Sequence, residues 1–303
     1  MKGDLNIKMN SYHRIDFRDE ISSNKWKSFL LVILVFLVLA ALVYVIGMAW
    51  GRMDIFFILI ISIVISLSYI LISYYNSGKI AVASVGAKRA DRNEYKEYYR
   101  LVEGLTLASG LPMPELYIMQ SNSINAFASG RDPKHAVVCV TEGSLEKLDK
   151  RELEGVLAHE LSHVANYDIR YMTLVAVMVG MIAIISEIFL RSLHSNSGGD
   201  NNKGKGIFIL IGVILAILAP IVVQLVQLAI SRKREYASDA NAVKFTRYPA
   251  GLIGALKKIK GDSFEPEKKV SKAVASLFFA NPLKNLTLTH PPIDSRIANL
   301  ERM

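Results

Sequence analysis

The residues best suited to chemistry in this sequence lie in the segment His-Glu-Leu-Ser-His at 159–163. On a helix, His159 and His163 share one face and lie one turn apart, so two imidazole nitrogens can bind one Zn²⁺. Glu160 would project beside such a metal, where its carboxylate can take a proton from the attacking water and later give it to the leaving amine. The spacing therefore predicts a site for peptide-bond hydrolysis with one zinc ion per chain.

A catalytic zinc site requires a third protein ligand and one open position. Glu235 is the best candidate, because it follows the last apolar run of the chain closely. Two apolar runs, 172–190 and 207–230, separate His163 from Glu235, and an even number of membrane crossings returns the chain to the same side. Asp239, one helical turn beyond Glu235, could orient a histidine ligand by accepting its second N–H. A helix-surface acid fits the spacing of Asp239 equally well.

The motif is expected on a helix that begins near Asp149. Asp149 and Glu152 match a capping box, with an acid at the N-cap and glutamate three residues later. Asn166 and Asp168 follow the motif, and either could support a histidine ligand or only cap the end of the helix. The predicted buried stripe of the helix consists of Leu153, Val156, Leu157 and Leu161.

The segment before this helix combines a further helix with short strands. Residues 93–109 have helical spacing and stop at Gly110, which is typical of a helix that ends in a glycine cap. Three runs with strand character follow, at 116–119, 124–128 and 136–140. We expect them to form a small antiparallel sheet, so that sheet and helices together make an α+β domain. Cys139 is the only cysteine, which excludes an intrachain disulfide, and it is expected to be a buried, inert thiol.

The apolar excess of the chain points to a membrane. Hydrophobic residues make up 51% of the sequence, and the mean hydropathy of +0.30 is high for a soluble enzyme. Four apolar runs account for it, at 29–50, 55–75, 172–190 and 207–230. Roughly 20 helical residues suffice to cross the hydrocarbon core, so we predict four transmembrane helices. The run 172–190 contains Glu187, and a re-entrant or interfacial placement of this run stays open.

Lysine and arginine gather before the first run, after the second and after the fourth, which places these segments in the cytoplasm. The predicted order is a cytoplasmic tail (1–28), a transmembrane hairpin (29–75), a first protease segment (76–171), a second hairpin (172–230) with a flexible far-side loop (191–206), and a second protease segment (231–303). The active site and both termini are therefore expected to be cytoplasmic. This topology explains the net charge of +9, and no nucleic-acid motif is evident, so no nucleic-acid partner is expected.

At these residues the chain resembles the HtpX-type heat-shock proteases, which are membrane members of the M48 family of gluzincin metallopeptidases. The resemblance covers nearly the whole chain. It rests on the N-terminal hairpin, on residues 159–168, on Arg-Glu-Tyr at 234–236 with Asp239, and on Thr-His-Pro-Pro-Ile-Asp-Ser-Arg at 289–296. It implies that zinc is bound by His159, His163 and Glu235. It also implies that Glu160 is the general base and that Asp239 supports a ligand.

The resemblance also implies a substrate-binding strand, Asn125-Ala126-Phe127-Ala128, at the edge of the sheet beside the cleft. An exposed edge can pair with an extended peptide through main-chain hydrogen bonds, with little sequence selectivity. His290 is a candidate for stabilising the oxyanion, and the alternative is that His-Pro-Pro only forms a turn. Arg296 is a candidate for bracing the site, and the alternative is that it faces solvent.

The role implied by the resemblance is proteolytic quality control and stress response at the bacterial inner membrane. The expected partners are unfolded or misfolded membrane proteins, cut in their cytoplasmic parts, and the lipid bilayer. A homo-oligomer is compatible with the sequence.

Three other functions compete with this one. An intramembrane metalloprotease would carry the motif inside a span, but charged residues flank it here, among them Lys150, Arg151 and Asp168. A prenyl-protein processing protease of the same broad family has more than four spans. A membrane receptor or holdase with a zinc site but no turnover would be favoured by loss of the base, and Glu160 is present.

Overall fold

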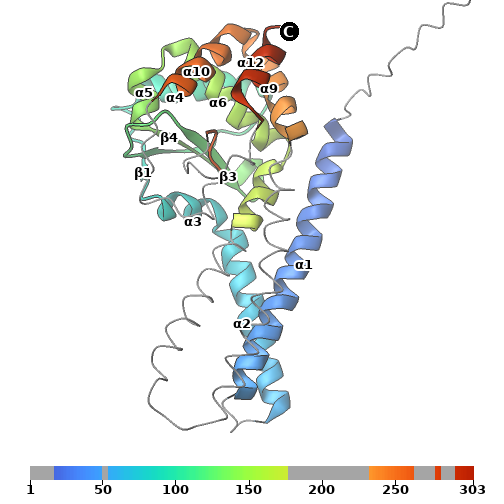
Figure 1. Ribbon diagram of the computed structural model, residues 1–303. Coiled ribbons are helices and arrows are strands. Elements are labelled where there is room, and N and C mark those ends of the chain that lie inside the picture. Colours follow the sequence, from blue (N-terminus) through green and yellow to red (C-terminus); the bar gives the residue numbers. More distant parts are fainter. Residues whose placement is uncertain (1–16, 50–53, 177–231, 263–276, 281–290) are drawn as a thin grey trace, which may run out of the picture.

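In the computed structural model, the described residues are 17–49, 54–176, 232–262, 277–280 and 291–303. They form a stalk of two long helices, α1 and α2, and a head in which helices cover both faces of a small sheet (Figure 1).

The stalk consists of α1 (Phe17–Ala49) and α2 (Ile55–Tyr75), which run antiparallel to each other (Figure 1). The α2 helix begins after Asp54, whose carboxylate accepts hydrogen bonds from two backbone N–H groups of the first turn. Among the described residues, α2 alone has the length and hydropathy of a membrane-spanning helix. The predicted run 29–50 lies largely in α1, whereas the runs 172–190 and 207–230 lie outside the described residues except for 172–176.

The sheet has the strand order β1-β2-β4-β3. Its strands are β1 (Lys88–Arg89), β2 (Glu115–Met119), β3 (Ala126–Gly130) and β4 (Ala136–Thr141). The prediction of an antiparallel sheet is wrong for one pair, because β2 and β4 run parallel, while β1–β2 and β3–β4 are antiparallel. All six residues of β4 are buried, and this apolar strand therefore takes a central position with β2 on one side and β3 on the other.

Alternate side chains of β4 point to opposite faces of the sheet. Val138 and Val140 belong to the core under α4 and α6, whereas Val137 and Cys139 pack with α3 (Ser77–Ser84) on the opposite face. Cys139 is buried, and burial raises the pKa of its thiol, as expected for an inert cysteine. Both faces of the sheet are therefore covered.

The motif helix is α6 (Lys150–Ala165), and its predicted start is confirmed. Asp149 is the N-cap, and the capping box with Glu152 is formed in both directions. The four residues of the predicted buried stripe are all buried. Earlier in the chain, α4 (Lys96–Ser109) ends as predicted at Gly110, which has a left-handed φ of 71°.

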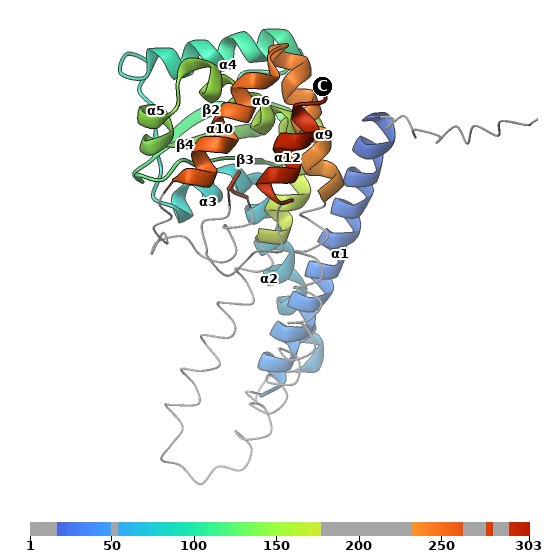
Figure 2. The same ribbon diagram turned by 45° about the horizontal axis from the view of Figure 1, so that its top comes forward.

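Helices from distant parts of the chain surround α6. Both α9 (Arg232–Thr246) and α10 (Pro249–Gly261) pack against α6, and α12 (Ile293–Leu300) packs on α9 and α10 (Figure 2). The 3-10 turn η1 (Pro133–His135) and the short helix α5 (Glu142–Lys147) flank β4 in the sequence. The motif helix is thus held between the sheet and the C-terminal helices.

Candidate metal centre

Helices α6 and α9 bring three potential metal ligands together. Candidate ligand atoms of His159, His163 and Glu235 all lie within 4.8 Å of one another, and all three residues are buried. The two histidine Nε2 atoms are 3.2 Å apart, and each lies 3.7 Å from a carboxylate oxygen of Glu235. Ligand atoms around a tetrahedral zinc with bonds of about 2.0–2.1 Å lie about 3.3 Å from each other. The donor types and their separations therefore fit Zn²⁺.

Carboxylates on the far side of both imidazole rings orient the ligand nitrogens. Asp239 Oδ1 lies 2.9 Å from Nδ1 of His159. Asp168 Oδ2 and Ser238 Oγ each lie 3.1 Å from Nδ1 of His163. A carboxylate at Nδ1 favours the proton on that nitrogen and leaves the Nε2 lone pair for a metal.

The pKa values of the two histidines are shifted in opposite directions. Burial and the charge of Arg296 lower the pKa of His159 to about 4, which keeps this ring neutral. Burial also lowers the pKa of His163, but the hydrogen bond to Asp168 and the charge of Glu235 outweigh it and raise the pKa to about 9. Because a histidine ligand binds a metal in its neutral form, a proton competes with the metal at His163.

Glu160 has the properties of a general base. It is buried next to the ligands, and burial, reinforced by the charge of Glu235, raises its pKa to about 7. The backbone N–H of Ala128 in β3 donates a hydrogen bond to its carboxylate. A carboxylate whose pKa lies near neutrality can both accept and return a proton at physiological pH.

Arg296 lies inside the site and does not face solvent, so the alternative considered for it is wrong. Its side chain is buried, and its Nε and Nη2 bond to both carboxylate oxygens of Asp239 at 2.9 and 2.6 Å. Its Nη1 lies 3.7 Å from Glu235. Asp239 is likewise buried, and the neighbouring Arg296 guanidinium helps to hold its pKa below the usual value despite that burial.

The predicted substrate strand is at the edge of the sheet, but this edge is not exposed. All residues of β3 are buried, and Phe127 forms an antiparallel bridge with Phe278. The side chain of Asn125, just before β3, is hydrogen-bonded to Ala280. The expectation of an open edge beside the cleft is therefore wrong, because residues 277–280 of the same chain cover it.

The two remaining predicted site residues are Asn166 and His290. Asn166 is the C-cap of α6, and its backbone N–H bonds to Ser162 and Val164, as the capping alternative predicted. His290 lies outside the described residues.

Sequence reasoning missed Ser238, which touches His163, and Asn241, whose amide donates to Ser162. Their position on α9, near Glu235 and Asp239, was the only available signal.

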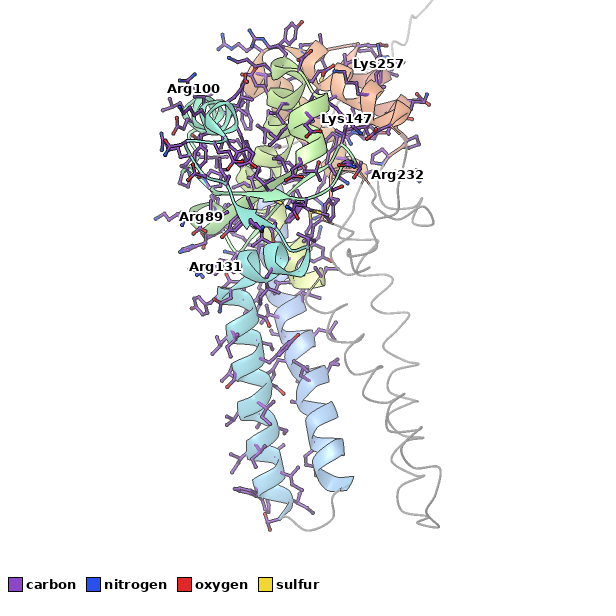
Figure 3. The ribbon with its side chains drawn as sticks, turned by 90° about the vertical axis from the view of Figure 1, so that its left-hand side faces the viewer. Arg89, Arg100, Arg131, Lys147, Arg232 and Lys257 are labelled. Atoms are coloured by element: carbon purple, nitrogen blue, oxygen red, sulfur yellow. The ribbon has the colours of Figure 1, made fainter. Side chains whose placement is uncertain are left out.

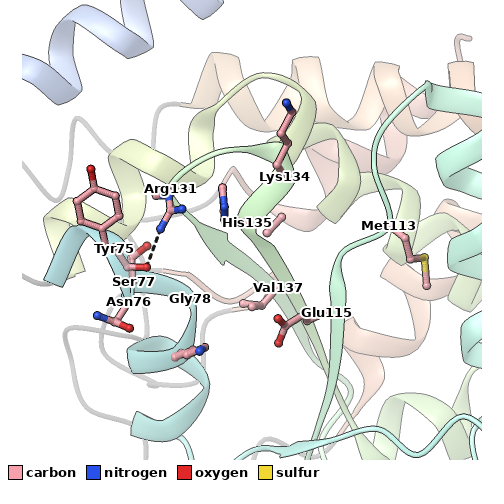
Figure 4. Close-up of a pocket in the computed structure, with 12 residues that line it drawn as sticks. Tyr75, Asn76, Ser77, Gly78, Met113, Glu115, Arg131, Lys134, His135 and Val137 are labelled. Atoms are coloured by element: carbon pink, nitrogen blue, oxygen red, sulfur yellow. Dashed lines mark hydrogen bonds between the residues drawn. The ribbon is translucent and has the colours of Figure 1, made fainter. Parts of the chain in front are cut away.

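A separate hollow of about 260 Å³ lies between the end of α2 and the β3–β4 turn. None of the candidate ligands lines it, although it contains the basic residues Lys79, Arg131 and Lys134. Figure 4 shows Arg131 directed toward Tyr75, to whose carbonyl it donates a hydrogen bond, and Lys134 directed away from it. The side chains of Arg131 and Lys134 therefore point in different directions.

The family model described as Peptidase family M48 matches residues 92–303, which is well over half of the chain. The chain belongs to peptidase family M48. It is 42% identical over 292 residues to a "Protease HtpX homolog" of Caldanaerobacter subterraneus subsp. tengcongensis, a match that covers 93% of this chain and 96% of the relative. A "Protease HtpX homolog" of Tropheryma whipplei (strain Twist) is 41% identical over 290 residues, covering 93% and 97% of the two chains.

One solved structure, the crystal structure of S. mikatae Ste24p, is similar at 18% sequence identity with a TM-score of 0.48. The match covers 93% of this chain but only 66% of the Ste24p chain.

The family model and the two HtpX homologues confirm the resemblance to HtpX-type M48 proteases. M48 membership makes the chain a metalloprotease, and its buried His159, His163 and Glu235 are compatible with a metal. The apolar α2 agrees with association of this M48 protease with a membrane.

Proposed function

We propose that this chain is a zinc-dependent endopeptidase that cuts misfolded or damaged membrane proteins at the cytoplasmic face of the bacterial inner membrane. The observation that carries the proposal is the buried convergence of His159, His163 and Glu235, with Glu160 beside them. The reaction is hydrolysis of a peptide bond, and the biological role is proteolytic quality control under stress.

In this proposal the chemistry that a bound Zn²⁺ supplies is Lewis acidity toward the peptide carbonyl and a lowered pKa of water. The carboxylate of Glu160 accepts a proton from the attacking water and returns it to the leaving amine. Asp239 and Asp168 hold the two histidine rings through Nδ1. Arg296 fixes Asp239 and adds positive charge near the reacting carbonyl, and we assign stabilisation of the oxyanion to His290.

The proposed anchoring rests on the contrast between stalk and head. Large apolar side chains of α2 are exposed, among them Phe56, Ile60 and Ile72, as expected for a surface in lipid. Figure 3 shows carbon-rich side chains along the stalk and places its labelled basic residues on the head. We propose that α1 and α2 form the first transmembrane hairpin, that residues 172–230 form the second, and that the protease segments 76–171 and 231–303 meet in the cytoplasm.

The test compares the detergent-solubilised full chain with its Glu160→Gln variant for bound zinc and for cleavage of casein. Glutamine keeps the shape of the side chain but cannot accept the proton, so cleavage should fall by about 10²–10⁴-fold while about one zinc per chain remains bound. The matched control is Glu154→Gln on the same helix, where Glu154 pairs only with Arg151 among the described residues, and it should cut normally.

The outcome also separates the enzyme from a receptor or holdase. If the unaltered chain binds zinc and an unfolded protein but cuts nothing, the site has no turnover and the proposed function is wrong.

A further inference from the structure

Residues 277–280, here called the internal segment, lie along the outer edge of β3 and form one isolated β-bridge with it. Phe278 pairs antiparallel with Phe127, and the backbone N–H of Phe279 donates to the carbonyl of Ala126 at 2.7 Å. On the same edge, the backbone N–H of Ala128 donates to the carboxylate of Glu160. A peptide backbone is therefore already bound next to the proposed general base.

The side chain of Asn125 binds this segment as one peptide group binds another. Its Nδ2 donates to the carbonyl of Ala280 at 2.8 Å, and its Oδ1 accepts from the backbone N–H of Ala280 at 3.0 Å. None of these contacts depends on the identity of the side chain at 279 or 280. Any extended segment could make them, which is the property of main-chain recognition at a sheet edge.

The side chains of the segment are apolar and enclosed. Leu277, Phe278 and Phe279 are each at most 3% exposed. The ring of Phe279 contacts the ring of His159 edge to face, with 4.9 Å between centroids. The guanidinium of Arg296 lies over the same Phe279 ring at 4.6 Å. The aromatic ring thus packs against both a candidate metal ligand and the arginine beside it.

We propose that Leu277–Ala280 occupies the strand position of the substrate, and that a substrate must displace it with an extended segment carrying large apolar side chains. This inference rests on the proposed protease function and names the substrate class for the same site.

The selectivity follows from competition between the internal segment and a substrate segment for one edge of the sheet. The internal segment is tethered to the site, which gives it a high effective concentration. Its removal exposes the apolar surfaces that Leu277, Phe278 and Phe279 now cover. A polar peptide could replace the backbone hydrogen bonds but would leave these surfaces in contact with water. A peptide with apolar side chains in the same register covers them again, as an exposed segment of a misfolded membrane protein would.

The test uses the full-length Glu160→Gln variant, which should bind peptides without cutting them, and backbone amide hydrogen exchange. The probe is a blocked peptide of sequence Gly-Leu-Phe-Phe-Ala-Gly, which copies the internal segment. The control peptide has serine in place of the leucine and both phenylalanines. The apolar peptide should bind at least about tenfold more tightly, since pockets of this kind discriminate apolar groups by roughly 10–200-fold.

Bound apolar peptide should speed amide exchange at 279 and 280, while β4 stays protected as the internal reference. The proposal is overturned if 279 and 280 remain protected at saturating peptide, because the segment would then be a permanent strand. Equal binding of both peptides, or no binding of either, overturns it as well. Casein cleavage by the unaltered chain is measured in parallel, and its absence would count against the protease function and not against the displacement.

Discussion

Arg296 and Asp239 form the buried ion pair that joins α12 to the candidate metal centre. The two guanidinium–carboxylate hydrogen bonds measure 2.9 and 2.6 Å, and Asp239 also contacts Nδ1 of His159. One carboxylate therefore serves two partners, a permanent cation and a metal-binding imidazole. Loss of its charge would take the nearest anionic partner from the buried Arg296, leaving Glu235 at 3.7 Å, and would release the ring of His159.

Asp239→Asn tests this double role. Because the buried Arg296 loses its hydrogen-bonded anionic partner, the fold should be destabilised by about 3–5 kcal/mol. Loss of the support for His159 should weaken zinc binding about 10–100-fold. Zinc affinity and the melting temperature in detergent are the measurements. The matched control is Asp294→Asn, because Asp294 is exposed on α12, the helix of Arg296, and pairs with Lys260. Equal effects of the two variants would show that Asp239 has no special role.

The close packing of α6 against α10 positions the motif helix. A Cβ atom built at Gly155 would lie 2.6 Å from the backbone nitrogen of Leu252, and one at Gly251 would lie 2.3 Å from the carbonyl oxygen of Arg151. The glycines thus allow the two helix backbones to approach closely, and α6 also packs against β3 of the sheet. The ligand histidines are one turn or more farther along the same helix.

Gly155→Ala should therefore force α6 and α10 apart and destabilise the head by about 1–3 kcal/mol. Gly104→Ala on α4 is the control, because no atom lies within 4 Å of a Cβ at that position. It should be neutral or stabilising by roughly 0.5–1 kcal/mol, since alanine favours a helix over glycine. Thermal unfolding of both variants decides the matter, and an unaffected Gly155→Ala chain would contradict the packing argument.

The α4 helix is joined to the sheet by the buried phenol of Tyr98, which donates to the carbonyl of Val138 at 3.1 Å. Burial raises the pKa of Tyr98 well above its usual value of about 10. Folding therefore favours the protonated phenol, and this contribution is fully present below about pH 10 and is lost as the pH rises through the folded pKa.

Tyr98→Phe should lower stability at pH 8 by about 0.5–1.5 kcal/mol, because one buried hydrogen bond is lost. Its melting temperature should then fall less between about pH 8 and 10.5 than that of the unaltered chain. Parallel pH profiles for the two proteins would show that Tyr98 does not carry the alkaline sensitivity.

Across the whole molecule, the sequence could predict what is local and not what joins distant segments. The capping box of α6, the glycine end of α4 and the spacing of His159 and His163 depend on neighbours in the chain, and the structure has them all. The parallel pairing of β2 with β4 depends on which strand takes the central position, and no local sequence pattern predicts the order of the strands. The same holds for Arg296 with Asp239 and for residues 277–280 on β3.

Asn166 and Asp168 show that the sequence can fail to identify a contact even between residues close in the chain. Either residue could have been the one that supports a histidine ligand. Both follow the motif helix closely, and both are polar. Tyr167 has a positive φ of 59°, so the chain turns after the Asn166 cap, and Asp168 is the residue that reaches His163. A left-handed tyrosine is uncommon, which is why the sequence alone could not rank the two residues.

The most direct test of the account is the zinc content of the full chain and of its Glu235→Gln variant, measured by elemental analysis together with casein cleavage. Glu301→Gln, at an exposed position near Lys257, is the control. The account predicts about one zinc for the unaltered chain and the control. For Glu235→Gln it predicts an affinity reduced more than about 100-fold and no cleavage. A Glu235→Gln chain that keeps one tightly bound zinc and cuts casein would contradict the assignment of Glu235 as the third ligand.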